Sequence, residues 1–155
     1  MNKVTVGKKL PAFSATQSDG TTFRLADARG RNLVLYFYPR DMTPGCTTES
    51  QNFRDLQSAF RKARTDIIGI SRDSVASHQR FRDKEQLPFQ LLADVDEKVC
   101  KLFDVIKEKN MYGKKVMGIE RSTFLIDGEG VLRQEWRKVK VPGHADEVLT
   151  AAKAL

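Results

Sequence analysis

Residues 33–46 read LVLYFYPRDMTPGC, and this stretch decides the fold. The apolar run at residues 33–38 ends in turn-forming residues, which is the pattern of a buried strand followed by a tight loop. A helical pattern follows, so Cys46 lies in the first turn of a helix. Unpaired backbone N–H groups and the positive end of the helix dipole favour thiolate over thiol at such a position. Because the thiolate is the reactive form, the stretch predicts a cysteine nucleophile.

The residues after Cys46 indicate which way its side chain points. The same helical face continues, at intervals of three or four residues, through Glu49, Phe53, Leu56, Phe60 and Ala63. This spacing predicts one helix over residues 46–63 with its apolar face toward a core. The thiol is therefore expected in a recess beneath the helix end. A buried structural cysteine is the alternative, since free cysteine is among the most buried residue types.

Two loop residues complete the predicted pocket. Thr43 lies three residues before Cys46, where its hydroxyl could hydrogen-bond the sulfur or an incoming oxygen. Pro39 has no N–H, so it could shield the pocket from water without competing for the thiolate.

Length and composition indicate one globular domain over residues 1–155, with 40% hydrophobic residues. The first twenty residues have no apolar stretch typical of a signal peptide, so neither secretion nor membrane spanning is expected. Two cysteines, at positions 46 and 100, make no disulfide framework, and a reducing cytoplasm is the expected compartment.

The formal net charge of +7 raises the question of nucleic-acid binding. The basic residues are dispersed, and even the densest cluster, RKVK at residues 137–140, has no aromatic stacking platform or recognition-helix pattern beside it. Solubility is the preferred explanation of the charge, with attraction of anionic partners as a second.

The rest of the chain alternates between strand and helix patterns. The predicted strands are residues 20–25, 33–38, 66–71, 90–92, 123–127 and 131–136, the last two forming a hairpin. The predicted helices are residues 46–63, 74–86 with Ser74 as cap, 95–103, and a last one opened by residues 143–146. Residues 104–121 show little periodicity and are predicted to be irregular. This order predicts an α/β fold with a mixed central sheet covered on both faces, and with Cys46 at the carboxyl end of strand 33–38.

The Pro39-x-x-x-Thr43-x-x-Cys46 spacing resembles the active-site signature of the peroxiredoxins, which are thiol-dependent peroxidases. GIERSTFLID at residues 118–127 is similar to the bacterioferritin-comigratory, or Q-type, branch, as are SRDS at 71–74 and KEKNMYG at 107–113. The resemblance covers nearly the whole chain and implies a thioredoxin-like fold with an N-terminal extension.

The resemblance also implies a mechanism. Cys46 would attack hydrogen peroxide or an alkyl hydroperoxide and become a sulfenic acid, while Thr43, the Cys46 N–H and Arg121 hold the oxygens. Glu49 would orient Arg121 or its hydrogen-bond network. Without the matched motif, Arg121 would be an ordinary surface arginine at a strand edge. No cofactor or metal is expected, and thioredoxin, a glutaredoxin or glutathione would recycle a monomeric enzyme that serves antioxidant defence.

The chain departs from the family pattern at the second thiol. Many Q-type members carry a resolving cysteine five residues after the peroxidatic one, or in the helix opened by Ser74; here those positions hold Gln51 and Arg82. The remaining thiol, Cys100, lies about 115° from the centre of the apolar stripe of its helix, at a boundary position, with the stripe formed by Val95, Val99, Leu102 and Phe103. A structural role for Cys100 is preferred, and the chain is expected to be a one-cysteine enzyme.

Other interpretations are weaker. His78 and His144 are expected at the surface or its boundary, and with the two cysteines they show no zinc-ligand spacing. A thioredoxin-like disulfide reductase or isomerase is disfavoured because Cys46 is not part of a Cys-x-x-Cys pair. A basic nucleic-acid-binding or chaperone-like module would leave the Thr43–Cys46 pocket unexplained.

Overall fold

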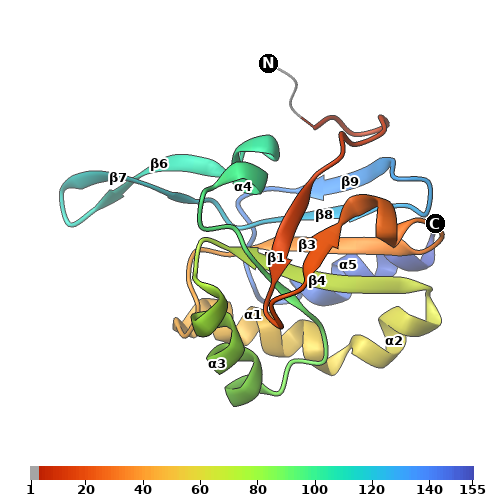
Figure 1. Ribbon diagram of the computed structural model, residues 1–155, viewed down its shortest axis with the longest axis horizontal. Helices are drawn as coiled ribbons and strands as arrows, with labels where there is room; N and C mark the ends of the chain where they lie inside the picture. The colour runs from red at the N-terminus through yellow and green to blue at the C-terminus, as the bar shows by residue number, and fades with distance from the viewer. Residues whose placement is uncertain (1–3) are drawn as a thin grey trace.

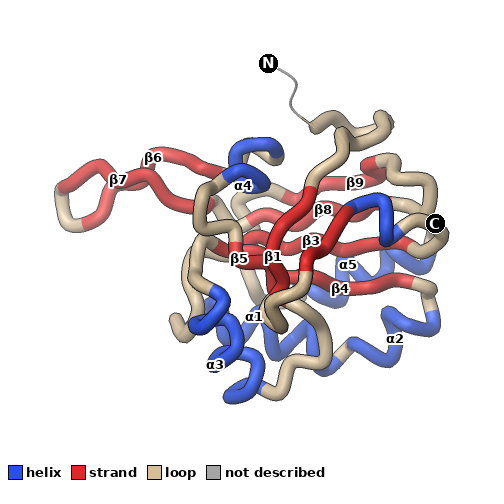
Figure 2. Tube along the Cα trace, in the orientation of Figure 1, coloured by secondary structure: helices blue, strands red, loops and turns tan. Residues whose placement is uncertain are grey.

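The computed structural model describes residues 4–155 as a seven-stranded sheet with helices on its faces and a two-stranded arm (Figure 1, Figure 2). The strands are β1 (Ser14–Gln17), β2 (Thr22–Arg24), β3 (Asn32–Phe37), β4 (Thr65–Ser71), β5 (Leu91–Ala93), β6 (Ile106–Met111), β7 (Lys114–Ile119), β8 (Ser122–Ile126) and β9 (Leu132–Trp136). The helices are η1 (Leu25–Ala28, a 3-10 turn), α1 (Pro44–Asp55), α2 (Gln57–Lys62), α3 (Val75–Glu85), α4 (Lys98–Leu102) and α5 (His144–Lys153). In the described residues no helix has the length and apolar character needed to cross a membrane.

The order of the sheet, β2-β1-β5-β4-β3-β8-β9, brings the predicted site together. The central strand β3 pairs parallel with β4 and antiparallel with β8. At its carboxyl end Phe37 lies beside Ile70 of β4 and Ser122 of β8. The loop that follows β3 and the residue that precedes β8 therefore meet at the same end of these two strands. The mixed sheet predicted from the element order is confirmed.

The sheet separates two hydrophobic cores. Successive side chains of a strand point to opposite faces. One core receives Leu33, Leu35 and Phe37 of β3, and the other receives Val34, Tyr36 and Tyr38. Helices α1, α2, α3 and α5 lie on the face of the second core, whereas α4 and the N-terminal segment lie on the face of the first (Figure 1).

The single helix predicted over residues 46–63 is wrong in one respect, because the structure divides it into α1 and α2 at Leu56. The Leu56 N–H bonds to the Phe53 carbonyl three residues back, so the last turn of α1 tightens. The inward stripe continues across this break, and the rings of Phe53 and Phe60 lie 5.9 Å apart.

The prediction that residues 104–121 are irregular is wrong. These residues contain the β6–β7 hairpin, an arm that projects from the rest of the protein (Figure 1). The turn at Tyr112 and Gly113 has positive φ at both residues, 53° and 78°, as in the two-residue turns that suit hairpins. The arm pairs with itself and leaves both faces largely in solvent, so its sequence lacks the buried alternate positions that give a strand its apolar period.

The predicted helix over residues 95–103 is shorter, and Cys100 is fully buried rather than at a boundary. The Asp94 carboxylate accepts hydrogen bonds from the N–H groups of Val99 (3.1 Å) and Cys100 (2.7 Å). These bonds start the helix late and leave Val95 64% exposed, outside the apolar stripe. The boundary assignment failed because the helix is only five residues long and the core surrounds it on more than one side, so that Val99, Cys100, Phe103 and Val105 are all buried together.

Candidate active site

Cys46 is the third residue of α1, and its side chain is only 1% exposed. The first helical hydrogen bond runs from the Thr47 N–H to the Thr43 carbonyl, at 2.9 Å. No described residue accepts a hydrogen bond from the N–H of Gly45 or Cys46, and Pro44 has none. Two unpaired donors at the positive end of a twelve-residue helix thus lie beside the sulfur, as the sequence predicts.

Arg121 immediately precedes β8 and bridges two residues of α1. Its Nη2 lies 3.5 Å from the Cys46 Sγ, and its Nη1 donates to Glu49 Oε1 at 2.7 Å. A Cβ at Gly45 would be only 3.2 Å from the Nη2, so glycine leaves room for the guanidinium. The predicted proximity of Arg121 to Cys46 and to Glu49 is confirmed. A fixed cation in this position can stabilise negative charge on sulfur and on oxygen.

Glu49 is buried beneath Arg121, with 1% of its side chain exposed. Burial raises the pKa of Glu49 to about 7, and the charge and hydrogen bond of Arg121 only partly oppose this. The second carboxyl oxygen, Oε2, is buried and has no hydrogen-bond partner among residues 4–155. The carboxyl group therefore changes charge near neutral pH directly behind the catalytic arginine predicted from the sequence.

Glu49→Gln is expected to flatten the pH dependence of stability. Folding raises the pKa of Glu49 from 4.5 to about 7, so its contribution is fully present below about pH 4.5 and is lost as pH rises through 7. The loss is on the order of 3 kcal/mol in the free energy of unfolding, taking about 1.4 kcal/mol per unit. Urea unfolding at about pH 5 and pH 8 measures it. Equal pH dependence in the wild type and the glutamine variant would contradict the assignment.

The other two residues predicted for the pocket are Thr43, at the N-cap of α1, and Pro39, in the loop before it. The Thr43 hydroxyl donates to the Arg40 carbonyl at 2.8 Å and makes no hydrogen bond to Cys46 in the described structure. Its oxygen can still accept a hydrogen bond, for example from the O–H of a hydroperoxide. Pro39 follows the end of β3 and is half-buried. Of the two alternatives for Thr43, the hydrogen bond to the sulfur is absent among the described residues, and the hydrogen bond to an incoming oxygen stays a prediction.

Lys109 has no role in the mechanism inferred from the sequence, yet its charge interacts with those of Arg121 and Cys46. It belongs to β6 of the arm, and its Nζ donates to the carbonyl of Ile119, two residues before Arg121. Burial lowers the pKa of Lys109, and the positive charge of Arg121 lowers it further, whereas Cys46 acts in the opposite direction. A second cation thus lies within electrostatic range of the sulfur. The KEKNMYG motif contained this residue, but only the hairpin register brings it to the site.

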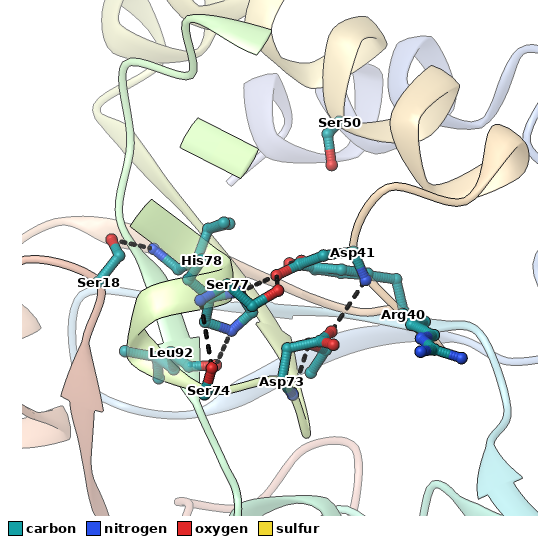
Figure 3. Close-up of polar contacts among 12 residues, drawn as sticks. Ser18, Arg40, Asp41, Ser50, Asp73, Ser74, Ser77, His78 and Leu92 are labelled. Carbon is teal, nitrogen blue, oxygen red and sulfur yellow. Dashed lines mark hydrogen bonds and ion pairs between the residues drawn. The ribbon is translucent and has the colours of Figure 1, made fainter. Parts of the chain in front are cut away.

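The two histidines predicted at the surface or its boundary are buried, so that expectation is wrong. His144 is 6% exposed, and its Nε2 lies 2.8 Å from the Thr123 hydroxyl. Burial lowers the pKa of His144 to about 4, with Arg121 adding to the effect. His78 is fully buried and contacts Asp41 in the loop that leads to Cys46 (Figure 3).

Asp41, Asp73 and His78 place three potential metal-ligand atoms within 4.8 Å of one another. The zinc-ligand spacing of cysteine and histidine gives no indication of this group, because two of its three members are aspartates. Its carboxylates are already engaged by donors: Asp41 accepts from Tyr38 and Ser77, and Asp73 accepts through one oxygen from the Asp41 N–H. The group is better described as a hydrogen-bond network than as a vacant ligand set.

The two cysteines lie on opposite faces of the sheet. Cys46 belongs to the core beneath α1, and Cys100 belongs to the core on the other face. Both are free thiols. Burial, and then the negative charge of Asp94, raises the pKa of Cys100 well above its usual range. A disulfide needs Cα atoms within about 7 Å, and the sheet lies between these two thiols.

Known proteins are similar to this chain over nearly its full length. The AhpC/TSA family matches residues 6–135. The chain is 58% identical over 137 residues to peroxiredoxin Bcp of Xanthomonas campestris, which covers 88% of this chain and 86% of that protein. It is 50% identical over 150 residues to peroxiredoxin Bcp of Bacillus subtilis, with 97% and 96% covered.

Solved structures show the same similarity in three dimensions. The bacterioferritin comigratory protein of Xanthomonas campestris, whose structures were described for its alkyl peroxide reduction activity, superposes with a TM-score of 0.90 at 53% identity, covering 97% of this chain and 98% of that one. A cysteine-to-serine mutant of PrxQ from Xylella fastidiosa gives a TM-score of 0.93 at 45% identity, with 99% and 98% covered. The chain therefore belongs to the AhpC/TSA family, in its Bcp or Q-type branch of peroxiredoxins, and is a thiol-dependent peroxidase of thioredoxin-like fold that takes a peroxide substrate and a thiol reductant.

Proposed function

We propose that Cys46 is the peroxidatic residue and that it reduces hydrogen peroxide and alkyl hydroperoxides. The observation that carries this proposal is the Arg121 guanidinium, which bridges the Cys46 Sγ and Glu49 beside unpaired helix N–H groups. The thiolate attacks one peroxide oxygen, the O–O bond breaks, and an S–O bond forms. Cys46 becomes a sulfenic acid, and the leaving oxygen takes a proton to become water or an alcohol. The alkyl peroxide reduction described for the Xanthomonas campestris relative supports the second substrate class.

Positioning and electrostatics supply the catalysis. Arg121, 3.5 Å from the sulfur, and the unpaired N–H groups of Gly45 and Cys46 would stabilise the charge that develops as the O–O bond breaks. Thr43 would accept a hydrogen bond from the peroxide, and Pro39 would exclude water from the pocket. Glu49 holds the Arg121 guanidinium from behind.

The enzyme uses one cysteine and an external donor. Gln51 and Arg82 occupy the positions where related enzymes have a resolving thiol. Gln51 donates to Glu85 of α3 at 2.7 Å, and Arg82, within α3, donates to the Leu87 carbonyl at 3.5 Å. A donor thiol would attack the Cys46 sulfenic acid, release water and form a mixed disulfide that a second thiol resolves. Thioredoxin, a glutaredoxin or glutathione fits this role for a monomeric, cytoplasmic enzyme.

Cys100→Ser and Cys100→Ala are expected to keep nearly full turnover with the donor. Cys100 lies across the sheet from Cys46, and the alanine variant separates loss of the thiol from the cost of burying a serine hydroxyl. Intact mass after one equivalent of peroxide, with and without a sulfenic-acid trap, should show one added oxygen or one trap adduct on Cys46. A Cys46–Cys100 disulfide in peptide maps, together with lost recycling in both variants, would make this a two-cysteine enzyme. No oxidation at Cys46 would defeat the proposed function itself.

A further inference from the structure

A buried polar pair lies behind the active-site loop and takes no part in the chemistry described so far (Figure 3). The His78 Nδ1 lies 2.7 Å from Asp41 Oδ2, and the two side chains are 0% and 1% exposed. Asp41 is in the loop between Pro39 and Cys46, whereas His78 is in α3, 37 residues later. The contact therefore joins the loop that delivers the nucleophile to a helix outside the site.

The Asp41 carboxylate is held from two elements, the end of β3 through Oδ1 and α3 through Oδ2. The Tyr38 hydroxyl donates to Oδ1 at 2.6 Å from the end of β3, and the Ser77 hydroxyl donates to Oδ2 at 2.8 Å from α3. Burial and the negative charge of Asp41 raise the pKa of Tyr38, so its hydroxyl remains a proton donor. The Asp41 N–H donates in turn to Asp73 Oδ2, at 2.8 Å.

The hydrogen-bond partners of His78 indicate which of its ring nitrogens carries a hydrogen. The His78 Nε2 lies 2.9 Å from the Leu92 carbonyl of β5, which can only accept, so Nε2 carries a hydrogen. The Nδ1 faces a carboxylate oxygen, so one proton is shared between Nδ1 and Asp41. The contact is thus a hydrogen bond whether the proton is on the imidazole or on the carboxyl group. It is buried, which strengthens it.

The loop needs this support because its next residue is strained. Met42 follows Asp41 and has a φ of 66°, in the left-handed region that a residue with a side chain rarely adopts. Such a conformation persists only where the surroundings fix it. Thr43 and the helix start carrying Cys46 come directly after Met42, so their positions depend on how Asp41 is held.

We infer that Asp41 and His78 are positioning residues for the peroxidase reaction, a role that rests on the proposed function of Cys46. They fix the loop so that Thr43 and the helix N–H groups meet a hydroperoxide while the sulfur attacks. The rate at which Cys46 reacts with peroxide therefore depends on Asp41 and His78, because the peroxide must be aligned with the sulfur. The rate at which Cys46 reacts with an electrophile that needs only a thiolate does not depend on them.

Two reactions of the same sulfur test this inference. Asp41→Ala and His78→Ala are expected to slow single-turnover oxidation of Cys46 by hydrogen peroxide by about 10- to 100-fold, the scale of small misplacements at a reacting centre. Alkylation of Cys46 by iodoacetamide at the same pH should stay within about twofold, because it depends on thiolate and access. Asp41→Asn should recover most of the peroxide rate, since an amide can accept from Tyr38 and donate to the His78 Nδ1.

Ser74→Ala is the matched control. Ser74 caps the same helix by accepting from the Ser77 N–H at 3.2 Å, and it makes no hydrogen bond to Asp41 in the described structure. Its loss should lower the thermal midpoint and leave the peroxide rate unchanged. The inference is overturned if Ser74→Ala slows peroxide as much as His78→Ala, or if oxidation and alkylation fall together. It is also overturned if the alanine variants keep the wild-type peroxide rate.

The variants also guard against a failure to fold. If Asp41→Ala does not fold, His78→Gln carries the test, because glutamine can still donate to the Leu92 carbonyl. A peroxide rate unchanged in a folded His78→Gln would then overturn the inference, and a selective loss would support it. A wild-type protein whose Cys46 does not react with peroxide would instead defeat the proposed function, before any variant is compared.

Discussion

Cys46→Ser is expected to reduce peroxide consumption to background, a loss of at least about 10³-fold, because it removes the covalent nucleophile. A hydroxyl in place of the thiol is small enough for the 1%-exposed site and can still accept a hydrogen bond from Arg121. The fold should therefore survive the change. Peroxide consumption in the presence of a thiol donor, with circular dichroism to verify the fold, measures the effect.

The matched comparison is with the second thiol. Cys100→Ser makes the same chemical change on the opposite face of the sheet and should keep its turnover. If Cys46→Ser retains substantial turnover, the reactive group lies elsewhere and the assignment fails.

Arg121→Ala is expected to slow the peroxide step by about 10²- to 10³-fold, the usual cost of removing one donor that stabilises developing charge. It should also reduce the fraction of Cys46 present as thiolate at neutral pH, because the nearest cation, 3.5 Å from the sulfur, is gone. Arg121→Lys should recover only part of the rate, since an ammonium cannot hold Glu49 and the sulfur through two separate nitrogens. Stopped-flow oxidation and alkylation against pH measure the two effects.

Arg133→Ala is the control for charge alone. Arg133 lies on β9, is half exposed and pairs with Asp127 at 3.1 Å, away from the site. Removing it should change neither measurement, because exposed ion pairs contribute little. Identical alkylation profiles for the wild type and Arg121→Ala would show that Arg121 does not stabilise the thiolate.

The local part of the site could be read from the sequence. The apolar run, the proline-framed loop and the helical spacing after Cys46 are features of adjacent residues, and the strand, loop and helix start are found where they predict. The approach of Arg121 to Cys46 is different in kind. It depends on the antiparallel pairing of β3 with β8, so it was accessible only through the family resemblance.

The misplaced residues share a physical cause. The side-chain hydrogen-bond partners of His78 come from the loop after β3 and from β5, and no pattern within its own helix reveals them. Lys109 reaches the site through a hairpin whose exposed faces carry no apolar period. Polar side chains are satisfied by distant segments, whereas apolar stripes are local, so sequence patterns find cores more readily than buried polar networks.

The separation of the two thiols by the central sheet has a practical consequence. Cys46, 1% exposed in the first turn of α1, is the thiol that we propose reacts with oxidant in the folded protein, whereas Cys100 is fully buried in the core on the other face of the sheet. Covalent modification of the two thiols therefore reports two different events. Adducts on Cys46 report how much oxidant the protein has met, and adducts on Cys100 report how often it has unfolded, so a single mass spectrum could distinguish oxidative exposure from loss of structure.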